Sequence, residues 1–532
     1  MCGILAVIGG TNNLELAKRQ LQKMVHREPD EHNLIATKYN QILGHQRLAI
    51  IDLETGRQPI QGRNSSTYVI HNGEIYNHEQ LRQELTKSHI RRTKSDSEII
   101  LHLYEERGED FLHQLDGDFA FVLVDGPKIL AGRDPIGIKP LFYGYDKNRT
   151  LWFASEFKAL VDVCVNIQVF PPGHYFTRER GFVRYVKDAW MDKSFLPKDS
   201  SVPLRETLEQ AIKKRLMSDV PLGILLSGGL DSSLIASIAA REMKKRGQTI
   251  KSFAIGINPE SYDLIAAKKV AQHIGSEHHE VIFSLEDGIK ALKESIYLLE
   301  TYDVGPIRSG TPMYLLMKYI QSQGIKVILS GEGADEIFGG YMYFHDAPSA
   351  MDFQHECVKK LLFLHTVDLW RVDRAGMGTS VEIRVPFLDQ EFLKTAMNLD
   401  PKFKMPHYGK RMEKHVLREA FDDEKFSYLP QEILWRQKEQ FQDGVGYYWV
   451  DGLKAFAEET ITNEEFELRA TLFPYNTPII KEAFLYRKIF EDKFQHSKVS
   501  TLIKMWNPTW QKNSESSGRF SPHHEQAKDV AG

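Results

Sequence analysis

The sequence is poor in cysteine and has no excess of either charge. Three cysteines occur among 532 residues, at Cys2, Cys164 and Cys357. This small, odd number argues against a disulfide framework and is typical of a reducing compartment, so we expect a cytoplasmic location. The net charge is −4, which offers no general attraction to nucleic acid or to an anionic membrane surface.

Long hydrophobic runs are also absent. No stretch approaches the roughly 18 consecutive apolar residues of a membrane helix. The start, residues 1–10, is apolar but short, lacks a basic leading region and is interrupted by glycines, so we expect no signal peptide. Hydrophobic residues make up 42% and charged residues 26%, which is ordinary for soluble globular protein. The length suffices for more than one domain.

The first third of the chain predicts an α+β domain, residues 2–185. One helix is expected near Ser95, because Ser95 and Asp96 can cap it and apolar residues then recur at helical spacing. A linker, 186–203, is expected to follow, because proline and polar residues gather near its end. Short strands with turn signals between them are expected at residues 119–124, 128–131, 141–145 and 151–154.

From residue 204 to residue 510, strands and helices alternate, which predicts an α/β domain with a parallel sheet. Helices are expected at 204–217, 231–245 and 264–274, and strands at 221–226, 251–257, 279–283 and 325–329. In such a sheet, ligands bind where loops leave the carboxyl ends of strands. Two glycine-bearing loops, 227–233 and 330–336, fall at such ends. The polar tail, 511–532, is expected to be disordered.

Cys2 is the first candidate for chemistry. If the initiator Met1 is removed, which a small second residue commonly permits, Cys2 carries a free α-amino group beside its thiol. Such an amine has a reference pKa of about 8 and can act as a general base. One residue would then supply both nucleophile and base. The alternative is that a cysteine at position 2 occurs by chance.

Other polar residues could complete a site around Cys2. An oxyanion that forms on an attacked amide needs fixed donors, and the Asn72 side chain and the Gly73 N–H can supply them. The alternative is a hairpin turn, for which Asn-Gly is a strong signal. Arg47 can hold a carboxylate through its planar fork, and Asp96 can hold an ammonium group. Either one alone is more commonly part of a surface ion pair or a helix cap.

Together, five segments resemble the class II glutamine amidotransferase domain, which has an N-terminal-nucleophile fold of stacked sheets with helices. In family order they are MCGI at 1–4, RLAII at 47–51, NGEIYN at 72–77, SDSE at 95–98 and GRDP at 132–135. By this resemblance, Cys2 attacks the carboxamide of L-glutamine, and Asn72 and Gly73 form the oxyanion hole. Arg47 takes the α-carboxylate, and Asp96 with Glu74 takes the α-amino end. The implied glutamine-binding residues are Arg47, Leu48, Ala49, Ile50, Ile51, Asn72, Gly73, Glu74 and Asp96.

One position departs from that family. The usual pattern is His-Arg-Gly-Pro-Asp, and this chain has HREPD at 26–30, with Glu28 in place of glycine. Glycine at such a position often serves a special backbone conformation or a close approach. Glu28 adds a side chain and a charge to a loop expected near the glutamine. Impaired or altered glutaminase activity is therefore one expectation.

The loop at 227–233 (SGGLDSS) lies between a predicted strand and a predicted helix. Backbone N–H groups of a glycine-rich turn at a helix N-terminus bind anions, and the hydroxyls of Ser227, Ser232 and Ser233 add donors. Asp231 could bind Mg²⁺ that offsets phosphate charge. No Walker A pattern occurs in the chain. The alternative is a flexible loop without a ligand.

This loop resembles the PP-loop of ATP pyrophosphatases, which cleave between the α- and β-phosphates and adenylylate a substrate. Further segments resemble asparagine synthetases: FAIG at 253–256, SGEGADE at 330–336, GGY at 339–341, EIRVPFLD at 382–389, EKH at 413–415, WRQKEQ at 435–440 and FPYNTP at 473–478. The resemblance implies a PP-loop synthetase domain that makes L-asparagine from L-aspartate through β-aspartyl-AMP. Ammonia from glutamine would pass between the domains, and a homodimer is implied.

Roles for individual residues follow from the same resemblance. Asp231 and Asp335 would organise Mg²⁺ and pyrophosphate, and Lys438 would stabilise the anionic transition state of adenylation. Taken alone, Lys438 would be interpreted as a solvated surface lysine. Glu332 would support attack by ammonia. Arg308 and Glu332 would both contact the aspartate substrate and the β-aspartyl-AMP intermediate. The implied ATP-binding residues are Leu226, Ser227, Gly228, Gly229, Asp231, Ser232, Ile255, Ser330 and Gly331.

A second departure follows ETYD at 300–303. Asparagine synthetases tend to carry Thr-Thr before Ile/Val-Arg-Ala-Ser, whereas this chain has Gly305 and Pro306 before Ile307 and Arg308. Two hydroxyls expected near the aspartyl-adenylate are thereby lost, and Pro306 stiffens the chain and lacks an N–H. Two alternatives to asparagine synthesis follow. One is a ligase of the same architecture that acts on another carboxylate, and the other is a catalytically impaired paralogue with a binding or regulatory role.

Overall fold

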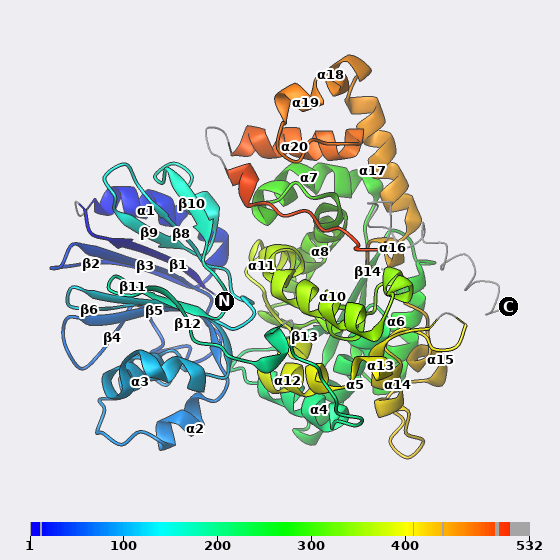
Figure 1. The fold of residues 1–532 in the computed structure, drawn as a ribbon, viewed down its shortest axis with the longest axis horizontal. Helices are drawn as coiled ribbons and strands as arrows, with labels where there is room; N and C mark the ends of the chain where they lie inside the picture. Colours follow the sequence, from blue (N-terminus) through cyan, green and yellow to red (C-terminus); the bar gives the residue numbers. More distant parts are fainter. Residues whose placement is uncertain are drawn as a thin grey trace.

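The computed structural model describes residues 2–10, 13–192, 194–407, 409–438, 441–494 and 499–510. The predicted tail, 511–532, lies outside the described residues. Figure 1 shows a strand-rich part, coloured blue to cyan, beside a larger part rich in helices. In the part of the chain that the structure describes, no helix is long and apolar enough to cross a membrane.

The first part contains two six-stranded antiparallel sheets, which confirms the predicted α+β domain. One sheet has the order β10-β8-β9-β1-β3-β2 and the other β12-β11-β7-β6-β5-β4. The strands of the first are β1 (Gly3–Ile8), β2 (Glu31–Thr37), β3 (Gln41–Arg47), β8 (Phe142–Tyr145), β9 (Leu151–Ala154) and β10 (Asn166–Val169). Those of the second are β4 (Ile60–Gln61), β5 (Thr67–Ile75), β6 (Gly117–Asp125), β7 (Lys128–Arg133), β11 (His174–Thr177) and β12 (Gly181–Arg184).

Strand β1 is buried on both faces, because successive side chains enter different cores. Ile4 and Ile8 pack with side chains of the second sheet, such as Val122 of β6. Leu5 and Val7 point to the other face, which is covered by α1 (Leu14–Gln22). This double burial explains why residues 4–8 are all apolar, and it holds Cys2 at the edge of the core.

Helix α3 (Glu98–Arg107) lies where the sequence predicts a helix, but its start differs from the prediction. Its N-cap residue is Ser97, and no side chain caps it. The expected cap by Ser95 or Asp96 is therefore wrong. Asp96 instead accepts a hydrogen bond from the backbone N–H of Ile75 in β5, at 2.8 Å, which fixes its carboxylate at the end of the second sheet.

The second part is built on a five-stranded parallel sheet of order β15-β14-β13-β16-β17, which confirms the predicted α/β domain. Its strands are β13 (Leu222–Leu225), β14 (Lys251–Gly256), β15 (Glu277–Ile282), β16 (Val327–Leu329) and β17 (Glu382–Arg384). Helices used below are α4 (Leu204–Arg215), α5 (Leu230–Lys245), α6 (Tyr262–Ile274), α7 (Leu285–Leu299), α8 (Val304–Ser322), α10 (Ala350–Phe363), α11 (Asp368–Met377), α14 (His415–Phe421), α17 (Tyr447–Thr460) and α20 (Lys481–Lys493).

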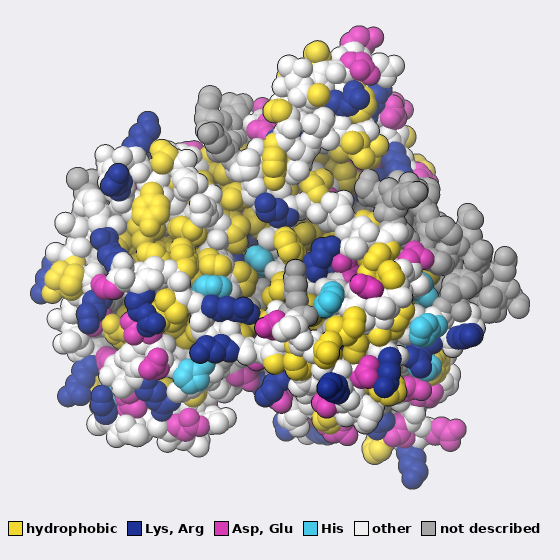
Figure 2. All heavy atoms as spheres, viewed as in Figure 1, with side chains coloured by type: hydrophobic (Ala, Val, Ile, Leu, Met, Phe, Trp, Pro, Cys, Tyr) yellow, Lys and Arg dark blue, Asp and Glu magenta, His cyan; other side chains and the backbone are white. Residues whose placement is uncertain are grey.

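The two parts share a hydrophobic cluster. Phe142 of β8 meets Trp370 of α11 edge to face, with ring centroids 5.1 Å apart. Phe157 packs against Phe494 just after α20, also at 5.1 Å. The two parts are therefore fixed against each other rather than joined only by the linker. On the face seen in Figure 2, side chains of both charges are interspersed.

Buried ion pairs cross the same boundary. Arg27 of the first part pairs with Glu156 at 2.6 Å and with Asp373 of the second part at 2.9 Å. Next to Asp373 in α11, Arg374 pairs with Glu300 at 2.7 Å, and all five side chains are nearly inaccessible to solvent. Buried charges are tolerated where they are paired in this way.

Candidate active sites

Cys2 and Asn72 meet where the two antiparallel sheets come together. The backbone nitrogen of Cys2 donates a hydrogen bond to Oδ1 of Asn72 in β5, at 2.8 Å. This bond turns the amide nitrogen of Asn72 away from the cysteine backbone. Among the described residues, that buried nitrogen has no hydrogen-bond partner. It is thus available as a donor to an oxygen that acquires charge next to Cys2.

Gly73 follows Asn72 in β5 and has a conformation that favours glycine. Its φ is +141°, and a Cβ atom at this position would lie 1.9 Å from the carbonyl oxygen of Asp118 in β6. The Asn-Gly pair therefore lies inside a strand and not in a hairpin turn. Strand β5 can approach β6 this closely because residue 73 has no side chain.

The thiol of Cys2 is buried, and burial raises its pKa above the ordinary value. The charge of Arg47 and the backbone N–H of Leu48 oppose this shift but do not outweigh it. The thiol is therefore neutral near pH 7. Because the thiolate is the nucleophile, attack by Cys2 requires a base close to the sulfur.

The structure places Arg47 at the end of β3, directly before the predicted binding segment. Leu48, Ala49 and Ile50 are buried. This segment is held from the second part of the molecule, because Asp219 donates its backbone N–H to the carbonyl of Ile50 at 3.0 Å. The guanidinium of Arg47 contacts Glu31 at 3.0 Å and lies 4% exposed.

Glu74 and Asp96 are both buried at the end of β5. Burial and the charge of Asp96 raise the pKa of Glu74 well above its ordinary value. The guanidinium of Arg384 in β17 lies 3.3 Å from the Glu74 carboxylate and lowers its pKa in part. A substrate ammonium group would complete this cluster of charges. Sequence reasoning did not assign Arg384 to this site.

Glu28 occupies a backbone conformation open to any residue, with φ −127°. Its carboxylate pairs with Nδ1 of His32 at 2.5 Å. Glycine is therefore not required at position 28 for conformational reasons. The glutamate is accommodated by a local side-chain contact four residues along the chain.

The second site is a cavity of about 500 Å³ at the carboxyl ends of β13, β14 and β16. This is the position at which parallel sheets bind ligands, and the size is that of a small-molecule site. Gly228 packs against Ala266 of α6, where a Cβ would approach to 2.4 Å with φ at +71°. The predicted residues that line the cavity are Leu226, Ser227, Gly229, Asp231, Ser232, Ile255, Arg308, Ser330, Gly331, Glu332, Asp335 and Lys438.

The loop before α5 is shaped by its serines. Oγ of Ser232 lies 3.0 Å from Oγ of Ser227 and accepts the backbone N–H of Ser227 at 3.2 Å. Gly229 is the N-cap residue of α5, and no side chain caps this helix. The first N–H groups of α5 therefore face the cavity without a capping side chain, as in an anion-binding helix N-terminus.

Four charged side chains alternate in sign across the cavity. Nζ of Lys414 lies 2.5 Å from Asp231 and 2.6 Å from Asp335, and Nζ of Lys438 lies 2.8 Å from Asp335. Burial raises the pKa of Asp335, but the two lysines lower it more, so the carboxylate stays ionised. Sequence reasoning missed Lys414, which was quoted only as part of a motif.

Glu332 is held by an arginine that sequence reasoning also missed. Arg371 of α11 donates to Oε1 of Glu332 at 2.8 Å and to Asp368 at 3.3 Å. All three residues line the cavity. The arginine fixes the glutamate carboxylate at the cavity wall.

The Gly305-Pro306 departure lies in the first turn of α8. Pro306 is the third residue of this helix, where no intrahelical N–H bond is needed, so the proline is compatible with the helix. Arg308 is 1% exposed and its guanidinium pairs with Glu482 of α20, at 2.6 and 2.8 Å. Arg308 therefore forms part of the wall with its charge already balanced.

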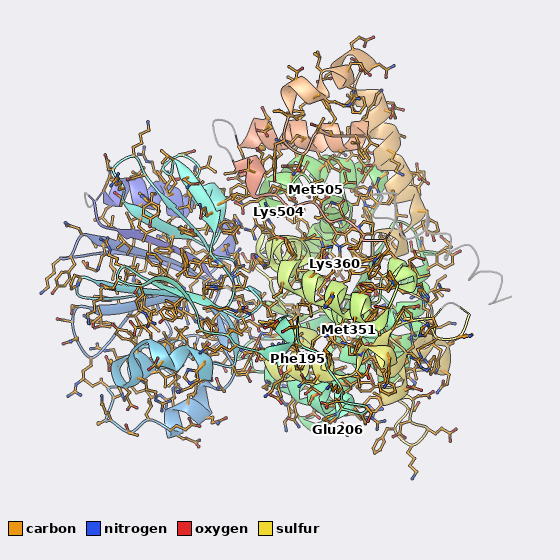
Figure 3. All side chains as sticks on the ribbon, viewed as in Figure 1. Phe195, Glu206, Met351, Lys360, Lys504 and Met505 are labelled. Atoms are coloured by element: carbon orange, nitrogen blue, oxygen red, sulfur yellow. The ribbon has the colours of Figure 1, made fainter. Side chains whose placement is uncertain are left out.

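A segment near the end of the chain closes one side of the cavity. Met505, Trp506 and Asn507 line it. The N–H of Trp506 donates to Asp303 at 2.9 Å, and Lys360 of α10 donates to the carbonyl of Asn507 at 2.7 Å. Figure 3 shows Lys360 on α10 and Met505 on this segment, which crosses the second part. No motif in the sequence indicates these contacts.

The two sites together define an amidotransferase joined to a nucleotide-using synthetase. A family model described as a glutamine amidotransferase domain matches residues 1–182. A second, described as asparagine synthase, matches residues 203–354 and 346–516. The chain belongs to the glutamine-hydrolyzing asparagine synthetase family, as the resemblance of its motifs predicts.

Individual relatives match over nearly their whole length. The chain is 47% identical to a probable glutamine-hydrolyzing asparagine synthetase of Dictyostelium discoideum, over 98% of this chain and 99% of the relative. It is 46% identical to asparagine synthetase 3 of Arabidopsis thaliana, over 98% and 94%. It is 45% identical to the asparagine synthetase of Zea mays, over 99% and 94%.

Proposed function

We propose that this protein makes L-asparagine from L-aspartate, with ATP as the activating substrate and L-glutamine as the nitrogen donor. The products are asparagine, AMP, pyrophosphate and glutamate. The observation that carries this proposal is the pair of sites in one chain. One site has an unpartnered amide donor beside Cys2, and the other has charges of alternating sign in a cavity at the end of a parallel sheet.

In the first site, Cys2 attacks the carboxamide carbon of glutamine. After removal of Met1, the free α-amino group takes the thiol proton and passes it to the leaving ammonia. The side-chain nitrogen of Asn72 and the N–H of Gly73 stabilise the oxyanion. Water then releases glutamate from the thioester. The raised pKa of the thiol supports a mechanism in which the base acts at the moment of attack.

In the second site, the β-carboxylate of aspartate attacks the α-phosphate of ATP and pyrophosphate leaves. Lys414 and Lys438 lie where they can offset the charge of the phosphates, and fixed cations of this kind act strongly in a buried site. Ammonia then attacks the β-carbonyl of aspartyl-AMP, loses a proton and displaces AMP. We assign Glu332 as the acceptor of that proton, and its contact with Arg371 at 2.8 Å supports this role.

Mg²⁺ is proposed as the metal of the second site. Among the described residues, no group of three or more His, Cys, Asp or Glu side chains could hold a metal ion alone. Asp231 and Asp335 nevertheless fit Mg²⁺, which is commonly bound by one or two carboxylates together with substrate phosphates. The Oδ1 atom of Asp231 is buried without a hydrogen-bond partner among the described residues and supports this assignment. Bound Mg²⁺ would supply positive charge to the phosphates.

A cytoplasmic location and a homodimer are also proposed. The free thiols of Cys2, Cys164 and Cys357 support a reducing compartment. The homodimer is inferred from the family to which the chain belongs, and light scattering of the purified protein would test it.

Replacement of the nucleophile tests the proposed function. We expect Cys2→Ala to abolish glutamine-dependent synthesis and to keep synthesis from ammonium, because only the first site needs the thiol. Aspartate, MgATP and either nitrogen source would be supplied while asparagine and pyrophosphate are measured. Glutamine use by the variant would refute the mechanism. The absence of turnover by the unaltered protein under every condition would refute the proposed enzymatic activity.

The same protein samples allow a check of the base. Intact-mass measurement should show that Met1 is absent from the active enzyme. An active protein that keeps Met1 would exclude the α-amino group of Cys2 as the base.

A further inference from the structure

Arg47, which would hold the α-carboxylate of glutamine, already pairs with a carboxylate of its own chain. Glu31 begins β2 and lies directly opposite Arg47 in the antiparallel β2–β3 pair. Oε2 of Glu31 accepts a hydrogen bond from Nη1 of Arg47 at 3.0 Å. Opposite charges at directly facing strand positions attract each other, so the register of the two strands creates this contact.

The other donors on the end of the guanidinium are also used. Nη2 of Arg47 donates to the carbonyl of Asp52 at 2.5 Å and lies 3.4 Å from that of Ile51. Both terminal nitrogens of Arg47 therefore have acceptors before any glutamine binds. The two carbonyls belong to the backbone that forms the site, whereas Glu31 contacts Arg47 through a side chain. Of these acceptors, Glu31 is the one that a substrate carboxylate can replace.

Burial shows which partner can move. The side chain of Arg47 is 4% exposed, and that of Glu31 is 25% exposed. The second carboxylate oxygen of Glu31 pairs with Arg57 at 3.0 Å, and Arg57 is 68% exposed. Arg57 and then Arg47 lower the pKa of Glu31, so it is ionised near neutral pH. Glu31 can thus turn toward Arg57 and solvent while Arg47 stays in place.

We propose that Glu31 is an internal competitor of glutamine, which occupies the carboxylate-binding arginine until substrate displaces it. The proposal rests on the proposed function, because it assigns Arg47 to the α-carboxylate of glutamine. Because glutamine must first displace Glu31, its apparent affinity is lower, although Glu31 does not touch the reacting atoms. Its effect falls on KM and leaves kcat unchanged, as for interactions equal in ground and transition states. Glu31 therefore sets the glutamine concentration at which the first site is half saturated.

Removal of the charge tests the proposal. In Glu31→Gln, we expect the KM for glutamine to fall by about fivefold to tenfold, as one charge-assisted contact to the arginine is released. The kcat of glutamine hydrolysis should stay within about twofold of the unaltered protein. Ammonium-dependent synthesis serves as the reference for correct folding. A KM that is unchanged or higher, in a variant that keeps this reference reaction, would overturn the proposal.

A binding measurement separates this proposal from the proposed function. Calorimetry with L-glutamine in the Cys2→Ala background needs no turnover. Tighter glutamine binding after Glu31→Gln in that background would support the role of Glu31 as a competitor. This holds even if the unaltered protein fails to hydrolyse glutamine, because that failure would refute only the glutaminase activity. Equal or weaker glutamine binding would overturn the proposal that Glu31 competes with glutamine, even if the enzyme is active.

Two further variants control for charge alone. Glu54→Gln makes the same charge change at an exposed position three residues before Arg57, so the KM should stay at the unaltered value. Arg57→Ala removes the second partner of Glu31, so Glu31 should pair more firmly with Arg47 and the KM for glutamine should rise. In the Glu31→Gln background, Arg57→Ala should have no effect, because Arg57 acts through Glu31. An equal effect of Arg57→Ala in both backgrounds would overturn the proposal.

Discussion

Lys414 lies within a motif of the sequence, but its place between two carboxylates becomes visible only in the fold. Its ammonium lies between the carboxylates of Asp231 and Asp335, and its side chain is 1% exposed. We expect Lys414→Met to leave the carboxylates of Asp231 and Asp335, which are 13% and 16% exposed, without the cation between them. This loss should cost about 3 kcal/mol of stability. Pyrophosphate release should fall by about 100-fold or more, since a fixed cation near the phosphates is lost. Chemical denaturation and a pyrophosphate assay measure the two effects.

The matched control is Lys410→Met, four residues earlier and exposed. It should change neither stability nor pyrophosphate release measurably. Glutamine hydrolysis by Lys414→Met should persist, because Cys2 lies in the other part of the molecule. Pyrophosphate release close to that of the unaltered protein would show that Lys414 has only a structural role.

The residues that the sequence predicts differ physically from those that become recognisable only in the fold. Cys2, Asn72 and Gly73 are proposed to act through their own chemical type, so a pattern in the sequence can predict them. Lys414 and Arg371 are ordinary cations whose importance comes from burial beside carboxylates far away in the chain. Only the tertiary fold creates those pairs, and a lysine considered by itself indicates a solvated surface.

At the scale of one element, α8 contains a proline that the helix accommodates. Pro312 has no N–H, so the carbonyl of Arg308 one turn earlier loses its intrahelical donor. Nε1 of Trp449 in α17 donates to that carbonyl at 2.7 Å. We expect Trp449→Phe to cost about 1–3 kcal/mol for the unpaired carbonyl, besides the loss of packed volume. Denaturant titration measures the change.

A second substitution isolates the hydrogen bond from the volume. Pro312→Ala supplies the missing N–H, so the double variant Pro312→Ala/Trp449→Phe should be more stable than the sum of the single effects by about 1 kcal/mol. Strict additivity would mean that the indole contributes through packing alone. This compensation joins the wall of the cavity, through Arg308, to the helices near the end of the chain.

The alternating elements at the start of the second part were predictable, whereas several later ones were not assigned from the sequence. Helices α10, α17 and α20 have no counterpart among the predicted helices. The alternation of strands and helices from residue 204 predicts the parallel sheet because buried strands are apolar throughout. Strand β17 was missed since it has three residues, two of them charged, in Glu382–Arg384. Its charges are paired with each other and with Glu74 across the boundary, which no local pattern indicates.

At the scale of the whole molecule, two kinds of ion pair join the parts. Arg27 and Asp373 are buried, and Arg27 also donates to the carbonyl of Cys2 at 3.0 Å. Lys326 and Asp30 cross the same boundary at 2.7 Å but are 30% and 25% exposed. Buried pairs are costly to break on one side, whereas exposed pairs contribute little. The buried pair should therefore be the one that transmits changes between the sites.

We expect Asp373→Ala to cost about 3–5 kcal/mol and to uncouple the two reactions, because Arg27 loses its partner across the boundary. More glutamate should form for each asparagine than in the unaltered protein. Lys326→Ala, the exposed counterpart, should cost less than about 1 kcal/mol and keep the ratio. Glutamate and asparagine are measured together at saturating substrates. If Asp373→Ala loses stability but keeps the ratio, or if both variants raise it equally, the buried pair holds the parts together without coupling their chemistry.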